Sequence, residues 1–488
     1  MVSDLRTFAR QVGPWTTGLT ACVWTVLVFV VLRAPLADYG IHVSVAERLI
    51  AGDRLYAEVW DNKDPLYFQS LALARLVTPM GGWLLEIGGL VLIGIAAFAL
   101  ATSLGLSRRL SVLTGWVGAP VIVVGVADPT AGVLAGVPLA LMSIALLVNG
   151  HRVSAGLILA FVPFFKITVF PVALAAFLAI IVLRRERGTW ARVAAGFGLG
   201  VLAVLALLAL RGELGPYLDS LRLNLAYSQE GGQAGGLTGL ITHLSPLTSQ
   251  SVQVTILGIL LALTLVRAGA ESRGPRQAGD AVSVVWWATV WASAAVVGVL
   301  AVTGKWPGHA KILVIPAVLA LLVGVAAGPA RLRLFGLAPT LAIVVLITLL
   351  SGAPSYRHVL SSLEYARANI NLQGAISQHS LVIQSTGPAS SYARVGQGDD
   401  PAHAVGLGQW TLACPRFQQY WWESPSTLQR TLDCLPNARV VLVTPDLYGP
   451  VSSPAWDDFQ QSVEMILSSG FDCRDADGVR ICVKRGSQ

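Results

Sequence analysis

The sequence predicts an α-helical protein that crosses a membrane many times and carries a small α/β domain at its C-terminal end. Of the 488 residues, 54% are hydrophobic and only 12% are charged, and the mean hydropathy is +0.65. A water-soluble fold cannot hide so much apolar surface, so the bilayer must solvate most of the chain. From about residue 352 onward the composition becomes polar, which indicates a separate domain.

Roughly eleven apolar runs approach the length of about 20 residues that a helix needs to cross the hydrocarbon. The expected spans are 15–36, 83–104, 110–127, 130–148, 153–167, 169–183, 193–210, 251–267, 282–303, 310–327 and 333–351. The first run lacks a small-residue cleavage site, so we expect it to be a span and not a signal peptide. Runs 153–167 and 169–183 are short, and Pro163, Lys166 and Pro171 near their junction are compatible with a shallow hairpin.

Basic residues between the spans predict the orientation. A set of arginines that flank the spans falls on one side of the predicted membrane: Arg6, Arg10, Arg108, Arg109, Arg152, Arg184, Arg185, Arg187, Arg267, Arg273, Arg276, Arg331 and Arg333. By the positive-inside rule this side is the cytoplasm, and the net charge of +7 is a topology signal and not a nucleic-acid surface. The first outer loop, 37–82, and the tail, 352–488, are then extracytoplasmic. The richness in Ala, Gly, Val and Arg is typical of a high-GC bacterium, which indicates the bacterial plasma membrane.

The cysteines support this orientation independently. Four of the five lie in the tail, where an oxidising compartment would favour two disulfides. The Asp-Gly turn at 477–478 places Cys473 opposite Cys482 in a hairpin, which leaves Cys414 to pair with Cys434. A four-cysteine zinc site is the alternative, although the Cys-x-x-Cys spacing typical of such sites is absent.

The tail alternates predicted strands and helices. The strands are Leu381–Gln384, Arg439–Thr444 and Val479–Val483, and the helices are Ser426–Leu435 and Trp456–Ser469. This alternation predicts a small α/β domain. It contains neither a phosphate-binding glycine motif nor a pattern typical of a catalytic triad, so we expect it to shape or cover a site made elsewhere.

The first outer loop is rich in charge. Apolar residues at helical spacing predict an interfacial helix over 41–50 that Gly52 would end, and Pro65 would start a second helix over 66–77. Asp38 lies at the membrane edge, where a carboxylate is unfavourable unless it has a function or a partner. The alternatives are a solvated helix end for Asp38, paired with Arg33 or Arg48, and a surface ion-pair cluster for Lys63 and its flanking aspartates.

A pattern in this loop resembles the opening loop of the GT-C glycosyltransferases, multi-span enzymes that include protein O-mannosyltransferases and aminoarabinose and arabinofuranosyl transferases. The matching residues are Asp38, Gly52, Leu55, Tyr56, Lys63, Pro65 and Leu66. Tyr39 and Asp64 depart from the acidic residue and the proline that family members often carry there. The resemblance implies inverting transfer of a sugar from a polyprenyl-phosphate donor to an extracytoplasmic glycan, lipid or protein.

The resemblance also assigns roles to individual residues. Asp38 is expected to be the catalytic base. Asp128, in the next outer loop, would orient the acceptor or join Asp38 in holding Mg²⁺ or Mn²⁺. The expected cations for the lipid phosphate and the further substrate-binding residues are Lys63, Lys166, His309, Lys311, His42 and Tyr56. Two of these have a structural alternative: Lys166 would only reach toward the interface, and His42 would be an exposed loop histidine.

A transporter or lipid flippase is the competing function, since many spans and polar residues within the membrane also suit permeation. No internal repeat is evident between the two halves, and the candidate residues gather at the outer face and not at the midplane. The predicted outer loop 211–250, with Tyr217, Asn224, Tyr227 and a glycine-rich stretch at 231–236, would either close over the site or serve as a connector.

Overall fold

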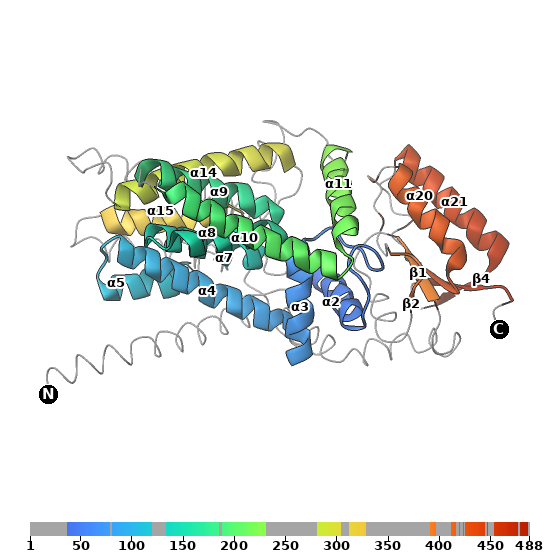
Figure 1. The fold of residues 1–488 in the computed structure, drawn as a ribbon. Helices are drawn as coiled ribbons and strands as arrows, with labels where there is room; N and C mark the ends of the chain where they lie inside the picture. Colours follow the sequence, from blue (N-terminus) through green and yellow to red (C-terminus); the bar gives the residue numbers. More distant parts are fainter. Residues whose placement is uncertain are drawn as a thin grey trace, which may run out of the picture. The chain divides into compact units, whose positions relative to one another are not determined.

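The computed structural model describes the main helical and tail segments (Figure 1). The described residues are 37–78, 81–119, 133–184, 188–230, 281–303, 312–327, 391–396, 411–415, 419, 423, 425–444, 447, 453–476 and 479–486. The expected spans 15–36, 251–267 and 333–351, the expected strand Leu381–Gln384 and the expected boundary at 351–352 lie outside them. The chain forms two compact units, Met1–Ala34 with Trp83–Val204 and Ala234–Leu360, and Pro35–Gly82 with Leu205–Gln233 and Ser361–Gln488.

The first unit is helical, as its composition predicts. Its elements are α4 (Gly81–Ser103), α5 (Arg108–Val112), a π-helix (Leu113–Gly118), α7 (Val133–Val148), α8 (Arg152–Phe165), a 3₁₀ turn (Ile167–Val169), α9 (Phe170–Arg184), α10 (Thr189–Leu210), α14 (Ala281–Thr303) and α15 (Val314–Ala327). Within the described residues, three helical stretches are long and apolar enough to cross a membrane: Ile167–Arg184, Thr189–Leu210 and Ala281–Leu300. Shorter apolar helices occupy Gly88–Ser103, Gly136–Val148, Arg152–Phe165 and Val314–Ala327.

Close approach of helix backbones organises this unit. A Cβ atom on Gly156 of α8 would overlap the carbonyl oxygen of Val193 in α10, and one on Gly196 of α10 would overlap the carbonyl oxygen of Val153. At Gly200, one turn further along α10, a Cβ would lie 2.6 Å from the Cβ of Ala160. Small residues at such positions let helices pack backbone to backbone, which is a common way to hold helices together in a bilayer.

The first outer loop forms two helices in the second unit, α2 (Ala37–Ile50) and α3 (Pro65–Val77). Both predicted helices are therefore present. Gly52 follows α2 with a φ of +103°, a conformation that favours glycine after a helix, and Pro65 is the first residue of α3. The predicted loop after residue 211 is different: α11 (Leu214–Glu230) occupies its first part, while residues 231–250 lie outside the described residues.

The tail forms a five-stranded sheet in the order β2-β1-β3-β5-β4. Its strands are β1 (Ser391–Val395), β2 (Thr411–Leu412), β3 (Val440–Val443), β4 (Phe471–Ala476) and β5 (Val479–Lys484). β1 is parallel to β2 and β3, whereas β5 is antiparallel to β3 and β4. Helices α20 (Pro425–Cys434) and α21 (Pro454–Gly470) lie on one side of the sheet (Figure 1) and share a core that includes Leu428, Phe459 and Val441.

The structure contains both expected disulfides. Cys473 and Cys482 are directly opposed in the β4–β5 pair and are bonded to each other, as the predicted hairpin requires. Cys414, beyond the end of β2, is bonded to Cys434 at the end of α20. The four tail cysteines are therefore structural cross-links within the tail and not the alternative zinc site.

Candidate functional site

The structure places only some of the expected site residues. Asp38 lies in the first turn of α2, on the segment that leads into the first outer loop. Asp128, His309 and Lys311 lie outside the described residues. Within the described part of the chain, no group of three or more His, Cys, Asp or Glu side chains could hold a metal ion. The roles assigned to Asp38 and Asp128 therefore stay predictions.

His42 joins the two helices of the loop. Its side chain is only 1% exposed, and its Nδ1 lies 2.9 Å from the hydroxyl oxygen of Tyr67 in α3. The imidazole also makes edge-to-face contacts with the rings of Tyr67 and Phe68. The alternative of an exposed loop histidine is wrong, because the α2–α3 packing buries a residue that the isolated sequence leaves at a helix surface.

Tyr56 shapes the segment between the two helices. Its backbone has a φ of +65°, in the left-handed region that is unfavourable for a residue with a side chain. Its buried hydroxyl donates a 2.6 Å hydrogen bond to the carbonyl oxygen of Lys63. Burial, and after it the charge of Asp64, raises the pKa of Tyr56 well above its usual value. The hydroxyl therefore stays protonated and keeps its hydrogen bond to Lys63, which holds the two ends of this short segment together.

Lys63 is oriented by its neighbours in sequence. Its ammonium group donates a 2.6 Å hydrogen bond to Oδ1 of Asn62, and its backbone N–H donates to Oδ1 of Asp61 at 3.0 Å. Across the part of the chain that the structure describes, Lys63 forms no ion pair with Asp61 or Asp64, so the expected alternative of a surface ion-pair cluster is wrong. The hydrogen-bond partner of its ammonium group is thus an amide oxygen of the same loop.

Glu213 is a central residue that the sequence analysis missed. Its fully buried carboxylate accepts hydrogen bonds from the backbone N–H of Leu55 at 3.1 Å, from Nε2 of Gln69 and from Nε of Arg211 at 2.9 Å. The residue lies between α10 and α11, after Gly212, whose φ of +69° turns the chain. The argument applied to Asp38, an acidic residue directly after an apolar run, would have identified Glu213 as well.

Helix α11 provides further contacts to the same loop. Nδ2 of Asn224 donates a 3.2 Å hydrogen bond to the carbonyl oxygen of Asn62, which precedes Lys63. The ring centroids of Tyr56 and Tyr217 lie 5.6 Å apart. Burial, followed by the charge of Asp64, raises the pKa of Tyr217 as well. The segment 53–64 is therefore held by α11 as well as by the two helices that flank it in sequence.

Two ion pairs hold the C-terminal end of α2 against the following loop and against α3. Arg48 pairs with Asp53 at 2.5 Å, and Arg75 of α3 pairs with Glu47 at 2.5 Å. The tail contacts the same segment, because the backbone N–H of Trp60 donates a 2.8 Å hydrogen bond to the carbonyl oxygen of Pro415. The loop that carries the candidate residues is thus bonded to its own helices and to the tail.

Lys166 belongs to the other compact unit. It lies between α8 and the 3₁₀ turn, with an extended backbone that ends α8, and its backbone N–H donates to the carbonyl oxygen of Val162. A Cβ atom added to Gly136 of α7 would lie 3.2 Å from the Cβ atom of Lys166. The break between the two short predicted spans is therefore real and falls at Lys166, whose role stays a prediction.

The fold is similar to those of solved proteins that include an arabinofuranosyltransferase. No protein-family model and no curated protein matches the sequence. Among solved structures, the ArnT protein from Cupriavidus metallidurans in its apo state matches with a TM-score of 0.54 and 12% identity over 97% of this chain and 98% of that chain. The same protein bound to undecaprenyl phosphate gives a TM-score of 0.55 and 13% identity over 96% and 98%. The mycobacterial arabinofuranosyltransferase AftD gives 0.50 and 14% over 96% of this chain and 40% of that chain.

Proposed function

We propose that this chain, which has the fold of the GT-C glycosyltransferases ArnT and AftD, transfers a sugar from a polyprenyl-phosphate lipid to an extracytoplasmic acceptor. The observation that carries the proposal is the likeness over nearly the whole chain to a protein solved with undecaprenyl phosphate bound. The pattern that begins at Asp38 supports it independently, because that pattern was identified from the residues alone. The acceptor would be a glycan, a lipid or a protein.

The expected reaction is a single displacement with inversion at the anomeric carbon. The acceptor hydroxyl attacks that carbon, the bond from the carbon to the phosphate oxygen breaks, and polyprenyl phosphate leaves. Asp38 is our candidate for the base that takes the proton from the hydroxyl. The leaving phosphate gains negative charge, so it needs a cation beside it. Lys63, whose ammonium group is oriented by Asn62, is our first candidate for that cation.

The remaining candidates keep the roles that the sequence suggested. Lys166, His309 and Lys311 are further proposed phosphate contacts, and Asp128 is proposed to orient the acceptor. Mg²⁺ or Mn²⁺, if bound, would suit the carboxylates of Asp38 and Asp128 and would supply positive charge at the phosphate. The expected site is the outer face of the bacterial plasma membrane, where a donor lipid can enter from within the bilayer.

The loop geometry supports a preformed site. Hydrogen bonds of Glu213, before α11, of Asn224 in α11 and of Tyr56 within the segment itself hold the segment that bears Lys63. Preorganised charges stabilise a developing negative charge more effectively than charges that must first be ordered. A loop held in this way suits phosphate stabilisation better than it suits a mobile gate.

The decisive experiment supplies the purified full-length protein with candidate polyprenyl-phosphate sugars and glycan, lipid or protein acceptors. Product formation is compared between the wild type and Asp38→Asn. Removing the base is expected to lower turnover by about 100-fold or more. Glu58→Gln is the matched control, because Glu58 lies in the same loop but pairs with Arg54 at the exposed surface.

Equal turnover of the wild type and Asp38→Asn would remove Asp38 from catalysis. Counterflow of a solute without cleavage of the sugar–phosphate bond would instead support the transporter. Inversion is checked separately, by determining the anomeric configuration of the product against that of the donor.

A further inference from the structure

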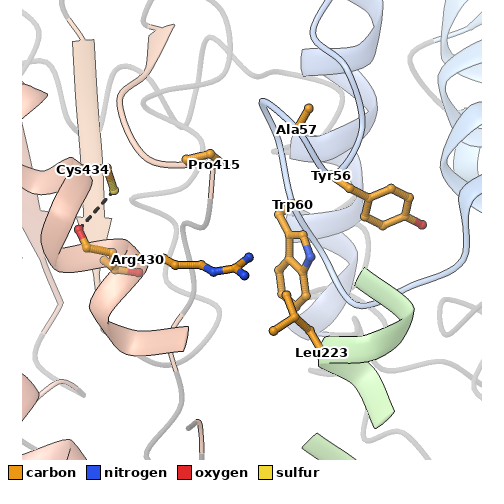
Figure 2. Close-up of a pocket in the computed structure, with 8 residues that line it drawn as sticks. Tyr56, Ala57, Trp60, Leu223, Pro415, Arg430 and Cys434 are labelled. Atoms are coloured by element: carbon orange, nitrogen blue, oxygen red, sulfur yellow. Dashed lines mark hydrogen bonds between the residues drawn. The ribbon is translucent and has the colours of Figure 1, made fainter. Parts of the chain in front are cut away.

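A small pocket lies between the first outer loop, α11 and the tail (Figure 2). Its volume is about 210 Å³, and all its described lining residues belong to the second compact unit. The lining residues are Tyr56, Ala57, Trp60, Leu223, Pro415, Arg430, Thr431 and Cys434. Of the expected site residues, Tyr56 lines this pocket, whereas neither Asp38 nor the described cations Lys63 and Lys166 are among the lining residues.

Two polar residues, Arg430 and Thr431, line the pocket. Figure 2 shows the side chain of Arg430 extending from α20 toward the indole of Trp60. Its guanidinium forms no ion pair or hydrogen bond with any residue that the structure describes. Thr431, next to it, is only 1% exposed, and its buried hydroxyl has no hydrogen-bond partner in the described structure. A buried hydroxyl without a partner is unfavourable, and it indicates a site that a polar ligand completes.

The walls of the pocket are held in place before any ligand arrives. The carbonyl oxygen of Thr431 lies 3.1 Å from the sulfur of Cys434, which is bonded to Cys414, so the disulfide braces the last turn of α20. Pro415 follows Cys414, and its carbonyl oxygen accepts the hydrogen bond from Trp60. The disulfide thus fixes the tail side of the pocket, and one backbone hydrogen bond connects that side to the loop.

The lining specifies the chemistry of the ligand. Trp60, Leu223 and Pro415 offer a flat aromatic and apolar surface, which suits the C–H face of a ring. Arg430 offers a planar set of donors that matches a carboxylate or a phosphate. The volume is below the several hundred Å³ typical of drug-sized ligands, so the pocket suits one ring and not a polyprenyl chain.

We infer that this pocket binds a sugar ring bearing an anionic group, carboxylate or phosphate, in the acceptor glycan. The anionic group would pair with Arg430, a ring hydroxyl would bond to Thr431, and the ring would pack on Trp60. Assigning this sugar to the acceptor rests on the proposed function, whereas the binding itself does not. The pocket would hold an acceptor chain at a point away from the reacting hydroxyl.

The test is a ligand-observed NMR titration of the full-length protein in detergent, without any donor lipid. The probes are D-glucuronate, D-glucose 6-phosphate and neutral D-glucose. We expect at least one anionic sugar to bind about tenfold or more tightly than glucose, as a charge-assisted hydrogen bond predicts. Arg430→Gln should abolish that difference, and Thr431→Val should weaken binding of the same sugar. The preferred anionic probe distinguishes a carboxylate from a phosphate.

Arg485→Gln is the matched control, because it removes an exposed arginine of the tail that pairs with Asp472 away from the pocket. It should bind the sugars as the wild type does. The inference is overturned if neither anionic sugar binds, if glucose binds as tightly as both, or if Arg430→Gln binds as the wild type does. Because no transfer is measured, the sugar can bind even if the proposed activity is absent, and transfer can occur even if this pocket is empty.

Discussion

The carboxylate of Glu213 accepts a hydrogen bond from the backbone N–H of Leu55, a residue 158 positions earlier in the chain. This bond connects the turn that precedes α11 to the loop that carries the glycosyltransferase-like pattern. The carboxylate is fully buried and also accepts from Gln69 and Arg211, so three donors from separate segments converge on it. The position of the candidate loop therefore depends on a residue that the pattern does not contain.

Replacing Glu213 with Gln is expected to destabilise the second unit by about 2 kcal/mol or more. The amide keeps one oxygen acceptor, loses the charge-assisted bond to Arg211, and turns a donor toward groups that also donate. The measurement is thermal denaturation together with hydrogen exchange at the Leu55 amide, which should become faster. Glu58→Gln, which alters an exposed ion pair with Arg54, should change both quantities little. Unchanged exchange at Leu55 in Glu213→Gln would show that the carboxylate does not hold the loop.

Tyr392 in β1 is expected to make stability fall at high pH. Burial raises its pKa to about 12 from the ordinary tyrosine value of 10.0. The folded pKa lies above the unfolded one, so the contribution is fully present below pH 10 and is lost as the pH rises through 12. This difference in the pKa of Tyr392 between the folded and unfolded states corresponds to about 2 to 3 kcal/mol in the free energy of unfolding.

Tyrosinate absorbance at 295 nm, recorded for the wild type and for Tyr392→Phe, isolates this titration. The difference spectrum should show a midpoint near 12, and the variant should lose stability less steeply with rising pH. A difference midpoint near 10 would mean that water reaches the hydroxyl.

The two disulfides are expected to have similar effects on stability but different effects on the pocket. Each closes a short loop, of 20 residues for Cys414–Cys434 and 9 for Cys473–Cys482, and removing either should cost about 3 kcal/mol in the chain-entropy model. Double Ser variants of each pair are compared by thermal denaturation under non-reducing conditions. Only the Cys414–Cys434 variant should also weaken sugar binding, because only that disulfide braces the turn that carries Thr431. Equal loss of sugar binding in both variants would show that the Cys414–Cys434 disulfide has no special effect on the pocket.

The α8–α10 contact should not tolerate a methyl group. In Gly196→Ala the new Cβ would meet the carbonyl oxygen of Val153, and the two helix backbones would have to separate, at an expected cost of about 1 to 3 kcal/mol. Gly198→Ala is the matched control, because a Cβ there meets nothing within 4 Å. It should be neutral or stabilising, since Ala is the better helix former. Thermal denaturation in detergent checks both, and equal stability of the two variants would show that α8 and α10 do not pack through Gly196.

Short-range patterns were sufficient for the fold class and for many of its elements. Apolar run length predicted the helices of the first unit. The spacing of the apolar residues from Ile41 to Leu49, with Gly52 after them and Pro65 beyond, predicted α2 and α3. The Asp-Gly turn set Cys473 opposite Cys482 because strand pairing across a tight turn is a local constraint. In each case the interacting residues are near one another in sequence, so their spacing alone specifies the contact.

Only the tertiary structure decided which polar side chains are buried and what they contact. His42 is buried because α3 covers it, Glu213 because the loop that it bonds closes over it, and Thr431 because the tail packs around the last turn of α20. Strand β1 and helix α11 were also missed, since short strands and mixed polar helices have weak periodicity. Contacts between segments more than a hundred residues apart leave no periodic trace in the sequence. The sequence alone therefore determined a membrane fold with a glycosyltransferase-like loop, and the packing determined how that loop is held.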